Sequence, residues 1–151
     1  MTMLFNNVVW FPVVPVAVDP VPADPLAEAR ARADRGDVAG AERLLTAATR
    51  RASTVELEHL HAVLLVELGQ TDKAVVCLRR ALYLDPRFII GHLVLGTTLR
   101  RLGDREGARR AYRNAIRLCG SWDPNVAVPL ADGASPAWLA GIARGEDARL
   151  D

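Results

Sequence analysis

Three histidines and two cysteines are among the residues of this 151-residue chain whose side chains could bind a metal ion or act as nucleophiles or bases. His59 and His61 stand two positions apart, so in a helix they point in roughly opposite directions and cannot bind one metal ion together. Cys77 and Cys119 are too few and too far apart for a disulfide framework or a zinc site, and both occupy apolar helical patterns. The spacing predicts buried thiols and no metal site.

The sequence also lacks the arrangement of a catalytic or cofactor-binding site. His61 and His92 fall at core-facing positions of helical patterns, and neither stands in a nucleophile or acid–base arrangement with a serine, a cysteine or a carboxylate pair. The eleven glycines form no Gly-x-Gly, and no strand leads into a glycine-rich loop that could hold a cofactor. We predict that the chain is not an enzyme and has no catalytic residues and no cofactor.

Composition is that of a single globular domain. Half of the residues are apolar and a quarter are charged, and the formal net charge of +1 gives no overall attraction to nucleic acid or to an anionic membrane. The apolar run from Val8 to Val18 is interrupted by Pro12 and Pro15, and no basic residue precedes Arg30, so the run resembles neither a signal peptide nor a membrane span. These features predict a cytoplasmic protein without membrane insertion.

A repeat of about 33 residues starts after Asp24 and predicts the helices that must position these side chains. One glycine and two alanines recur with the same spacing in three copies, at Gly36, Ala41 and Ala48, at Gly69, Ala74 and Ala81, and at Gly103, Ala108 and Ala115. Each glycine lets a helix end and the chain turn, and each alanine pair allows a neighbouring helix to approach closely. Each copy is therefore predicted to be a helical hairpin.

Capping residues predict where the hairpins begin. Asp24 opens the first, Ser53 with Glu56 forms a capping box for the second, and Asp85-Pro86 ends one helix and opens the third hairpin. The predicted fold class is all-α, a right-handed superhelical solenoid of three hairpins at about 24–54, 55–88 and 89–122. A loop and a capping helix from about Ser135 are predicted in residues 123–151, where they would cover the last apolar face.

Residues 1–23 are predicted to be an extended segment, because prolines alternating with valines favour polyproline II or edge-strand geometry over a helix. The apolar residues that precede the prolines, among them Trp10, would be an aggregation liability if they were free in solution. We therefore expect the segment to lie in a groove of its own or of a neighbouring chain, or to pair with a second copy by self-association.

The repeats resemble a known family. The third copy resembles a tetratricopeptide repeat in the pattern His92-x2-Leu95-Gly96-x2-Leu99, Gly103, Ala108-x3-Tyr112-x2-Ala115. The second copy is similar at Ala62, Leu65, Gly69, Ala74, Leu78, Ala81 and Pro86. The resemblance implies a solenoid that binds protein or peptide partners.

A narrower resemblance rests on the run Arg80-Ala81-Leu82-Tyr83-Leu84-Asp85-Pro86 and the tail Val128-Pro129-Leu130-Ala131-Asp132-Gly133. Both are similar to the repeat region that follows the catalytic domain in CheR-type chemotaxis receptor methyltransferases. This resemblance implies a regulatory or receptor-targeting module, with a chemoreceptor or signalling protein as its partner and methylation of glutamates by a separate catalytic domain that uses S-adenosylmethionine. The alternative is a freestanding adaptor or chaperone that binds an amphipathic partner segment.

The concave face is the first candidate for binding that partner, because the opening helix of each hairpin lines it. Helical periodicity predicts a partner-binding groove that is apolar in the middle and charged at its ends, lined by Arg30, Glu56, His59, Val63, Glu67, Leu93, Thr97 and Arg100. The Lys and Asn clamp with which some tetratricopeptide domains hold a C-terminal carboxylate is absent from the corresponding positions. The groove therefore favours an apolar or amphipathic segment.

A basic face is the second candidate. Arg110, Arg113 and Arg117 align along one side of the third closing helix, which is expected to lie on the convex surface. Such a patch suits an acidic protein partner or is merely solvated. No aromatic residue is interleaved with the arginines to stack on bases, so nucleic acid is not expected as a partner.

Overall fold

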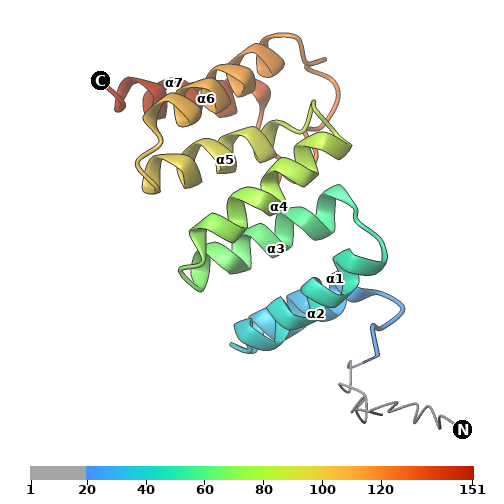
Figure 1. Cartoon of the computed structure of the whole chain (residues 1–151). Coiled ribbons are helices and arrows are strands. Elements are labelled where there is room, and N and C mark those ends of the chain that lie inside the picture. The colour runs from blue at the N-terminus through green and yellow to red at the C-terminus, as the bar shows by residue number, and fades with distance from the viewer. Residues whose placement is uncertain (1–19) are drawn as a thin grey trace, which may run out of the picture.

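The computed structural model describes residues 20–151, and this part of the chain contains seven α-helices and no strand (Figure 1). The helices are α1 (Pro25–Asp34), α2 (Val38–Arg51), α3 (Val55–Glu67), α4 (Thr71–Leu84), α5 (Ile89–Arg101), α6 (Arg105–Gly120) and α7 (Pro136–Ala148). Each helix packs on the next along the chain, so α1 and α7 lie at opposite ends of a stack (Figure 1). The predicted all-α solenoid with a terminal helix is confirmed.

The predictions for Trp10 and for self-association through the N-terminal segment concern residues 1–19, which lie outside the described residues. Among the helices of residues 20–151, none combines the length and the apolar character that crossing a membrane requires.

Each hairpin turns at a glycine, as the repeat predicted. Left-handed φ values of +84°, +73° and +82° belong to Gly36, Gly69 and Gly103, and this region strains any residue with a side chain. After each glycine, a backbone N–H reaches back to a carbonyl of the preceding helix, from Asp37 to Arg32, from Gln70 to Leu65 and from Asp104 to Leu99. These are the hydrogen bonds of a Schellman motif. The same helix stop therefore recurs three times.

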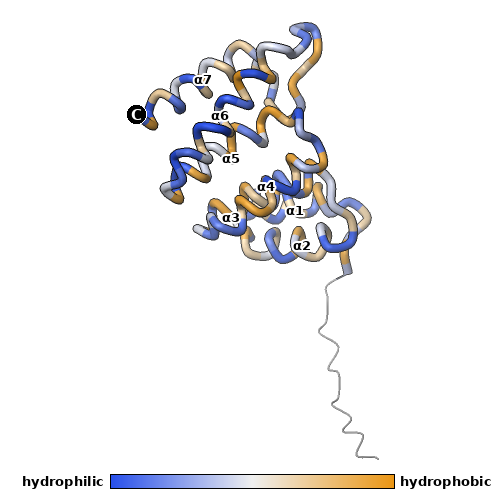
Figure 2. The backbone as a smooth tube through the Cα atoms, turned by 45° about the horizontal axis from the view of Figure 1, so that its top comes forward, coloured by the Kyte–Doolittle hydropathy of each residue, from blue (hydrophilic) through white to orange (hydrophobic). Residues whose placement is uncertain are grey.

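The recurring alanines are buried in the helix packing. None of them is more than 3% exposed, and they are Ala41, Ala48, Ala74, Ala81, Ala108 and Ala115. Larger apolar side chains fill the space around them, and Figure 2 shows hydrophobic residues recurring between hydrophilic ones along the helices. The alanine pairs thus allow helices to approach, and the leucines and valines between them form the core.

The predicted capping box at the start of α3 is wrong by one residue. The N-cap is Thr54, whose hydroxyl oxygen accepts the backbone N–H of Leu57 at 3.3 Å. Ser53 instead donates its hydroxyl to Glu58 Oε1 at 2.6 Å. Threonine and serine are both good N-caps; here Thr54 caps the helix, while the Ser53 hydroxyl bonds the buried Glu58.

The predicted start of α5 at Asp85-Pro86 is also wrong, because the helix begins at Ile89 with Phe88 as its N-cap residue. The Asp85 carboxylate accepts the backbone N–H of Arg87 at 2.9 Å, which closes a tight turn instead of capping a helix. Asp85-Pro86 therefore ends α4, as predicted, but leads into a turn.

Close packing between α5 and α6 makes Gly96 a testable position. A Cβ atom on Gly96 would lie 2.5 Å from Cε1 of the buried Tyr112 ring, whose hydroxyl is 3.2 Å from Thr97 Oγ1. Either the ring or the helix would have to move. We expect Gly96→Ala to lower the free energy of unfolding by about 1 to 3 kcal/mol, although alanine is the better helix former. Guanidinium chloride unfolding followed by circular dichroism measures this change.

Gly141→Ala in α7 is the matched control, because a Cβ there meets no atom within 4 Å. It should leave stability unchanged or raise it by up to about 1 kcal/mol through helix propensity. A Gly96→Ala protein as stable as the wild type would contradict the close approach of α5 to α6.

Candidate functional site

A groove of about 270 Å³ lies along the face formed by the opening helices α3 and α5 and the terminal helix α7. Its lining is mostly apolar and consists of Val63, Val66, Glu67, Leu93, Val94, Thr97, Thr98, Arg101, Tyr112, Ile142 and Glu146. Tyr112, from α6, reaches the groove from behind α5. Because α7 packs on α6 as an opening helix of a fourth hairpin would, it adds a wall to the groove as well as covering the end of the solenoid.

The polar groups inside the groove are already hydrogen-bonded within the protein. Thr97 Oγ1 lies 3.2 Å from both the Leu93 carbonyl and the Tyr112 hydroxyl, and Thr98 donates to the Val94 carbonyl at 2.7 Å. A ligand therefore does not need to form hydrogen bonds with these hydroxyls. Val63 and Leu93 are half-buried, so each still presents apolar surface to a ligand. The middle of the groove favours an apolar side chain over a polar one.

Charged side chains stand at the rim of the groove. Glu67 and Arg101 are exposed, on α3 and α5 respectively. Glu146 of α7 lies 3.5 Å from Arg100 of α5, and this ion pair joins two walls of the groove; Glu146 also pairs with Arg149 at the end of its own helix at 2.5 Å. Both signs of charge therefore border the apolar middle, which suits a segment that has charged residues on either side of apolar ones.

Four of the eight groove residues predicted from periodicity line this groove, namely Val63, Glu67, Leu93 and Thr97. The other four, Arg30, Glu56, His59 and Arg100, lie outside its lining. The His59 ring packs edge-on against Phe88, with 5.4 Å between ring centroids. Burial, and secondarily the positive charge of Arg30, lower the pKa of His59, so this side chain is neutral near pH 7.

Sequence reasoning missed Val66, Val94, Thr98, Arg101, Tyr112, Ile142 and Glu146 as groove residues. Tyr112 was recognised as part of the repeat pattern, and Ile142 lies on the predicted capping helix. The four-residue spacing of Ile142 and Glu146 on one helical face was the signal that could have placed both beside the groove.

Two of the three arginines of the predicted basic face form ion pairs within the protein. Arg113 lies 3.6 Å from Asp147 of α7, and Arg110 lies 3.8 Å from Glu106, one turn earlier on α6. Arg117 is exposed. The Arg113 side chain is thus paired with α7, but it is still 67% exposed, and all three arginines remain accessible to a partner.

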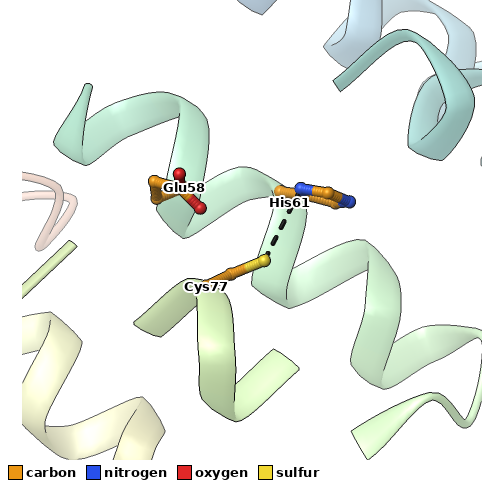
Figure 3. A group of neighbouring side chains, drawn as sticks. All are labelled: Glu58, His61 and Cys77. Carbon is orange, nitrogen blue, oxygen red and sulfur yellow. Dashed lines mark hydrogen bonds between the residues drawn. The ribbon is translucent and has the colours of Figure 1, made fainter. Parts of the chain in front are cut away.

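A buried polar cluster between α3 and α4 was not predicted. Figure 3 shows that Glu58 and His61, one turn apart on α3, converge with Cys77 of α4. Cys77 Sγ is 3.6 Å from His61 Nδ1, and His61 Nε2 is 3.3 Å from Glu42 Oε1 on α2. Burial, together with the negative charge of Glu58, raises the pKa of Cys77 to about 12. The predicted burial of Cys77 and Cys119 is confirmed.

The Glu42 carboxylate ties this cluster to the first hairpin. Burial acts to raise the pKa of Glu42, but hydrogen bonds from Thr46 and His61 outweigh it, so its pKa is lowered. Glu42 is therefore ionised near pH 7 and favours a proton on His61 Nε2. The free lone pair of His61 Nδ1 then faces Cys77.

The other core histidine has a simpler role. His92 Nε2 is 3.0 Å from the Pro86 carbonyl, which can only accept, so the histidine N–H donates. The bond joins α5 to the turn that precedes it. Burial lowers the pKa of His92 overall, which keeps the ring neutral near pH 7.

The model of the tetratricopeptide repeat family matches residues 59–88 and 91–121. The part of the chain from α3 to α6 therefore contains two tetratricopeptide repeats. No curated protein matches its sequence.

Several solved structures share its fold. One is PcrH, a protein of Pseudomonas aeruginosa, in complex with the chaperone binding region of PopD, with a TM-score of 0.68, 14% identity and coverage of 83% of this chain and 87% of PcrH. SycD, the type III secretion translocator chaperone of Yersinia enterocolitica, has a TM-score of 0.68 at 12% identity, covering 83% and 80%. The Sgt2 tetratricopeptide domain of Aspergillus fumigatus has a TM-score of 0.62 at 22% identity, covering 84% and 80%.

Proposed function

We propose that this chain is a non-catalytic adaptor or chaperone that holds an apolar or amphipathic segment of a partner protein in the groove between α3, α5 and α7. The observation that carries the proposal is the groove itself, whose polar groups are internally bonded and whose apolar middle is bordered by charges of both signs. An extended or helical segment with two or three apolar side chains would bury them there and place its charged residues at the rim.

The structural relatives support this choice of ligand. PcrH was crystallised with a chaperone binding region, and SycD is a translocator chaperone, so two proteins of this fold hold or serve protein partners. The other hypothesis, a module attached to a chemotaxis-type methyltransferase, draws no support from the groove or from these relatives. We therefore place the adaptor or chaperone first.

A displayed library of random short peptides, selected against the full chain, tests the proposal without knowledge of the natural partner. We expect enriched peptides to carry apolar residues flanked by charged ones, because that pattern matches the groove. A photo-reactive benzoylphenylalanine at position 67, on the groove rim, should crosslink to these peptides. The same group at position 126, in an exposed loop outside the groove, is the control.

Crosslinks at position 67 and none at position 126 would support the groove as the binding site. Peptides that crosslink at position 126 instead, or that carry no apolar residues, would contradict the proposed function.

A further inference from the structure

We propose that Glu58, His61 and Cys77 form a binding site for a divalent transition-metal ion with the ligand preferences of Zn²⁺. This goes beyond partner capture, and it departs from the sequence prediction of no metal site, which considered pairs of histidines and cysteines alone. The three side chains supply one oxygen, one nitrogen and one sulfur ligand, the donor types that Zn²⁺ accepts in proteins.

The spacing of the donor atoms fits a metal ion. One donor atom from each residue lies within 4.8 Å of the other two. Cys77 Sγ and His61 Nδ1 are 3.6 Å apart. Two ligands at ordinary Zn–S and Zn–N distances and a tetrahedral angle would be separated by about 3.5 Å. The Cys77–His61 pair already stands at that separation.

The Glu58 carboxylate has binding capacity that the protein does not use. Its side chain is only 1% exposed, and Oε2 is buried without a hydrogen-bond partner. Ser53 donates to the other oxygen, Oε1, at 2.6 Å and fixes the orientation of the carboxylate. A buried carboxylate oxygen without a partner is costly, and a cation bound between Glu58 and Cys77 would remove that cost.

A second layer of residues orients the histidine ligand. His61 Nε2 lies 3.3 Å from both Glu42 Oε1 and Thr46 Oγ1. Metal-binding histidines commonly donate their other ring N–H to a carboxylate, which fixes the tautomer and makes the free nitrogen a better ligand. Glu42 provides that carboxylate, so His61 presents Nδ1 toward Cys77.

The site is neutral in charge when loaded and is accessible from one side. The Cys77 thiolate and the Glu58 carboxylate balance the two positive charges of the ion, and binding transfers the thiol proton to water.

A pocket of about 440 Å³ between α2, α3 and α4 is lined by both His61 and Cys77. An ion can enter from this pocket, and a water molecule can complete a fourth position. The pocket is also lined by four basic side chains, which would slow entry of a cation without changing the donor set: Arg43, Arg50, Lys73 and Arg80.

Titration of the full chain with Co²⁺ tests the site, because cobalt bound to a thiolate gives a charge-transfer band in the near ultraviolet. We expect the band in the wild type and in Cys119→Ser, and its loss in Cys77→Ser. Cys119 is also buried, so it is the matched control. We also expect Zn²⁺ to raise the thermal midpoint of the wild type and of Cys119→Ser, and not that of Cys77→Ser.

Glu42→Gln keeps the proposal testable if Cys77→Ser does not fold. It retains all three ligands and removes only the carboxylate behind His61, so the affinity for Zn²⁺ in competition with a chelator should fall by about 10- to 100-fold. The absence of a cobalt–thiolate band in the wild type, or a band that persists in Cys77→Ser, would overturn the proposal. An unchanged Zn²⁺ affinity in Glu42→Gln would overturn the assignment of Glu42.

Discussion

Removal of α7, by ending the chain after Ala134, is expected to lower the free energy of unfolding by several kcal/mol and to cause association of the truncated protein. The helix contributes two leucines that are almost completely buried, Leu139 at 2% and Leu150, just after its end, at 4% exposed. Burying a leucine side chain is worth about 1.5 to 3 kcal/mol, so the two account for roughly 3 to 6 kcal/mol. That is a large part of the stability of an ordinary domain, about 5 to 15 kcal/mol.

Most of this decrease in the free energy of unfolding should come from the lost burial of apolar side chains and not from the lost ion pairs. α6 is joined to the C-terminal residues by Arg109, which lies 3.5 Å from Asp147 and 2.5 Å from Asp151. Ion pairs near the protein surface contribute about 0 to 1 kcal/mol. Without α7, the cluster around Ile89 and Leu118 would lose its cover and become a site for self-association.

Guanidinium chloride unfolding and size-exclusion chromatography with light scattering measure the two effects. Leu139→Ala tests the same contact without truncation and should cost about 2 to 5 kcal/mol. Ile142→Ala on the same helix is the control, because Ile142 is 38% exposed and should matter much less for stability. A truncated protein that remains monomeric with an unchanged midpoint would show that α7 does not cover the solenoid end.

Simultaneous Val63→Asp and Leu93→Asp substitutions are expected to abolish binding of groove-selected peptides or of the natural partner. The two side chains come from neighbouring opening helices and face the same groove. A carboxylate at either position must be desolvated when an apolar side chain binds against it. We expect a loss of at least about tenfold for each substitution, which corresponds to about 1.4 kcal/mol each.

Val126→Asp is the matched control, since it makes the same change at a 51% exposed loop residue and should leave binding intact. Circular dichroism should show unchanged helicity in the groove variant, and Val63→Ala with Leu93→Ala provides a milder pair if aspartate lowers stability. Normal binding by the groove variant, together with a loss on reversing the charges of Arg110 and Arg117, would place the interaction on the convex face.

The hairpins could be predicted from sequence because their signals are local. A glycine that ends a helix acts through its own φ and through hydrogen bonds to residues at most five positions away. Residues at a fixed spacing on one helix share a face whatever that face touches. Val63 with Glu67, and Leu93 with Thr97, therefore line one groove as their periodicity predicts, while their role in binding a partner stays a prediction.

Other features required the packing of whole helices. α3 is buried on more than one side, with Leu57, Glu58 and His61 all shielded from solvent, so periodicity could not show that a glutamate lies inside the core. Glu58, His61 and Cys77 meet only because α4 folds back along α3, and Glu42 joins them only because α2 packs on the other side.

What the sequence by itself determined is the repeat frame, the helix stops and the order of the hairpins, because each depends on residues within a few turns of one another. The tertiary structure alone decided where α7 lies, which residues of α6 and α7 line the groove, and which polar side chains of α3 are buried. These depend on contacts between helices far apart in the chain, and the strength of such contacts depends on the area that both surfaces bury together, which no single helix encodes.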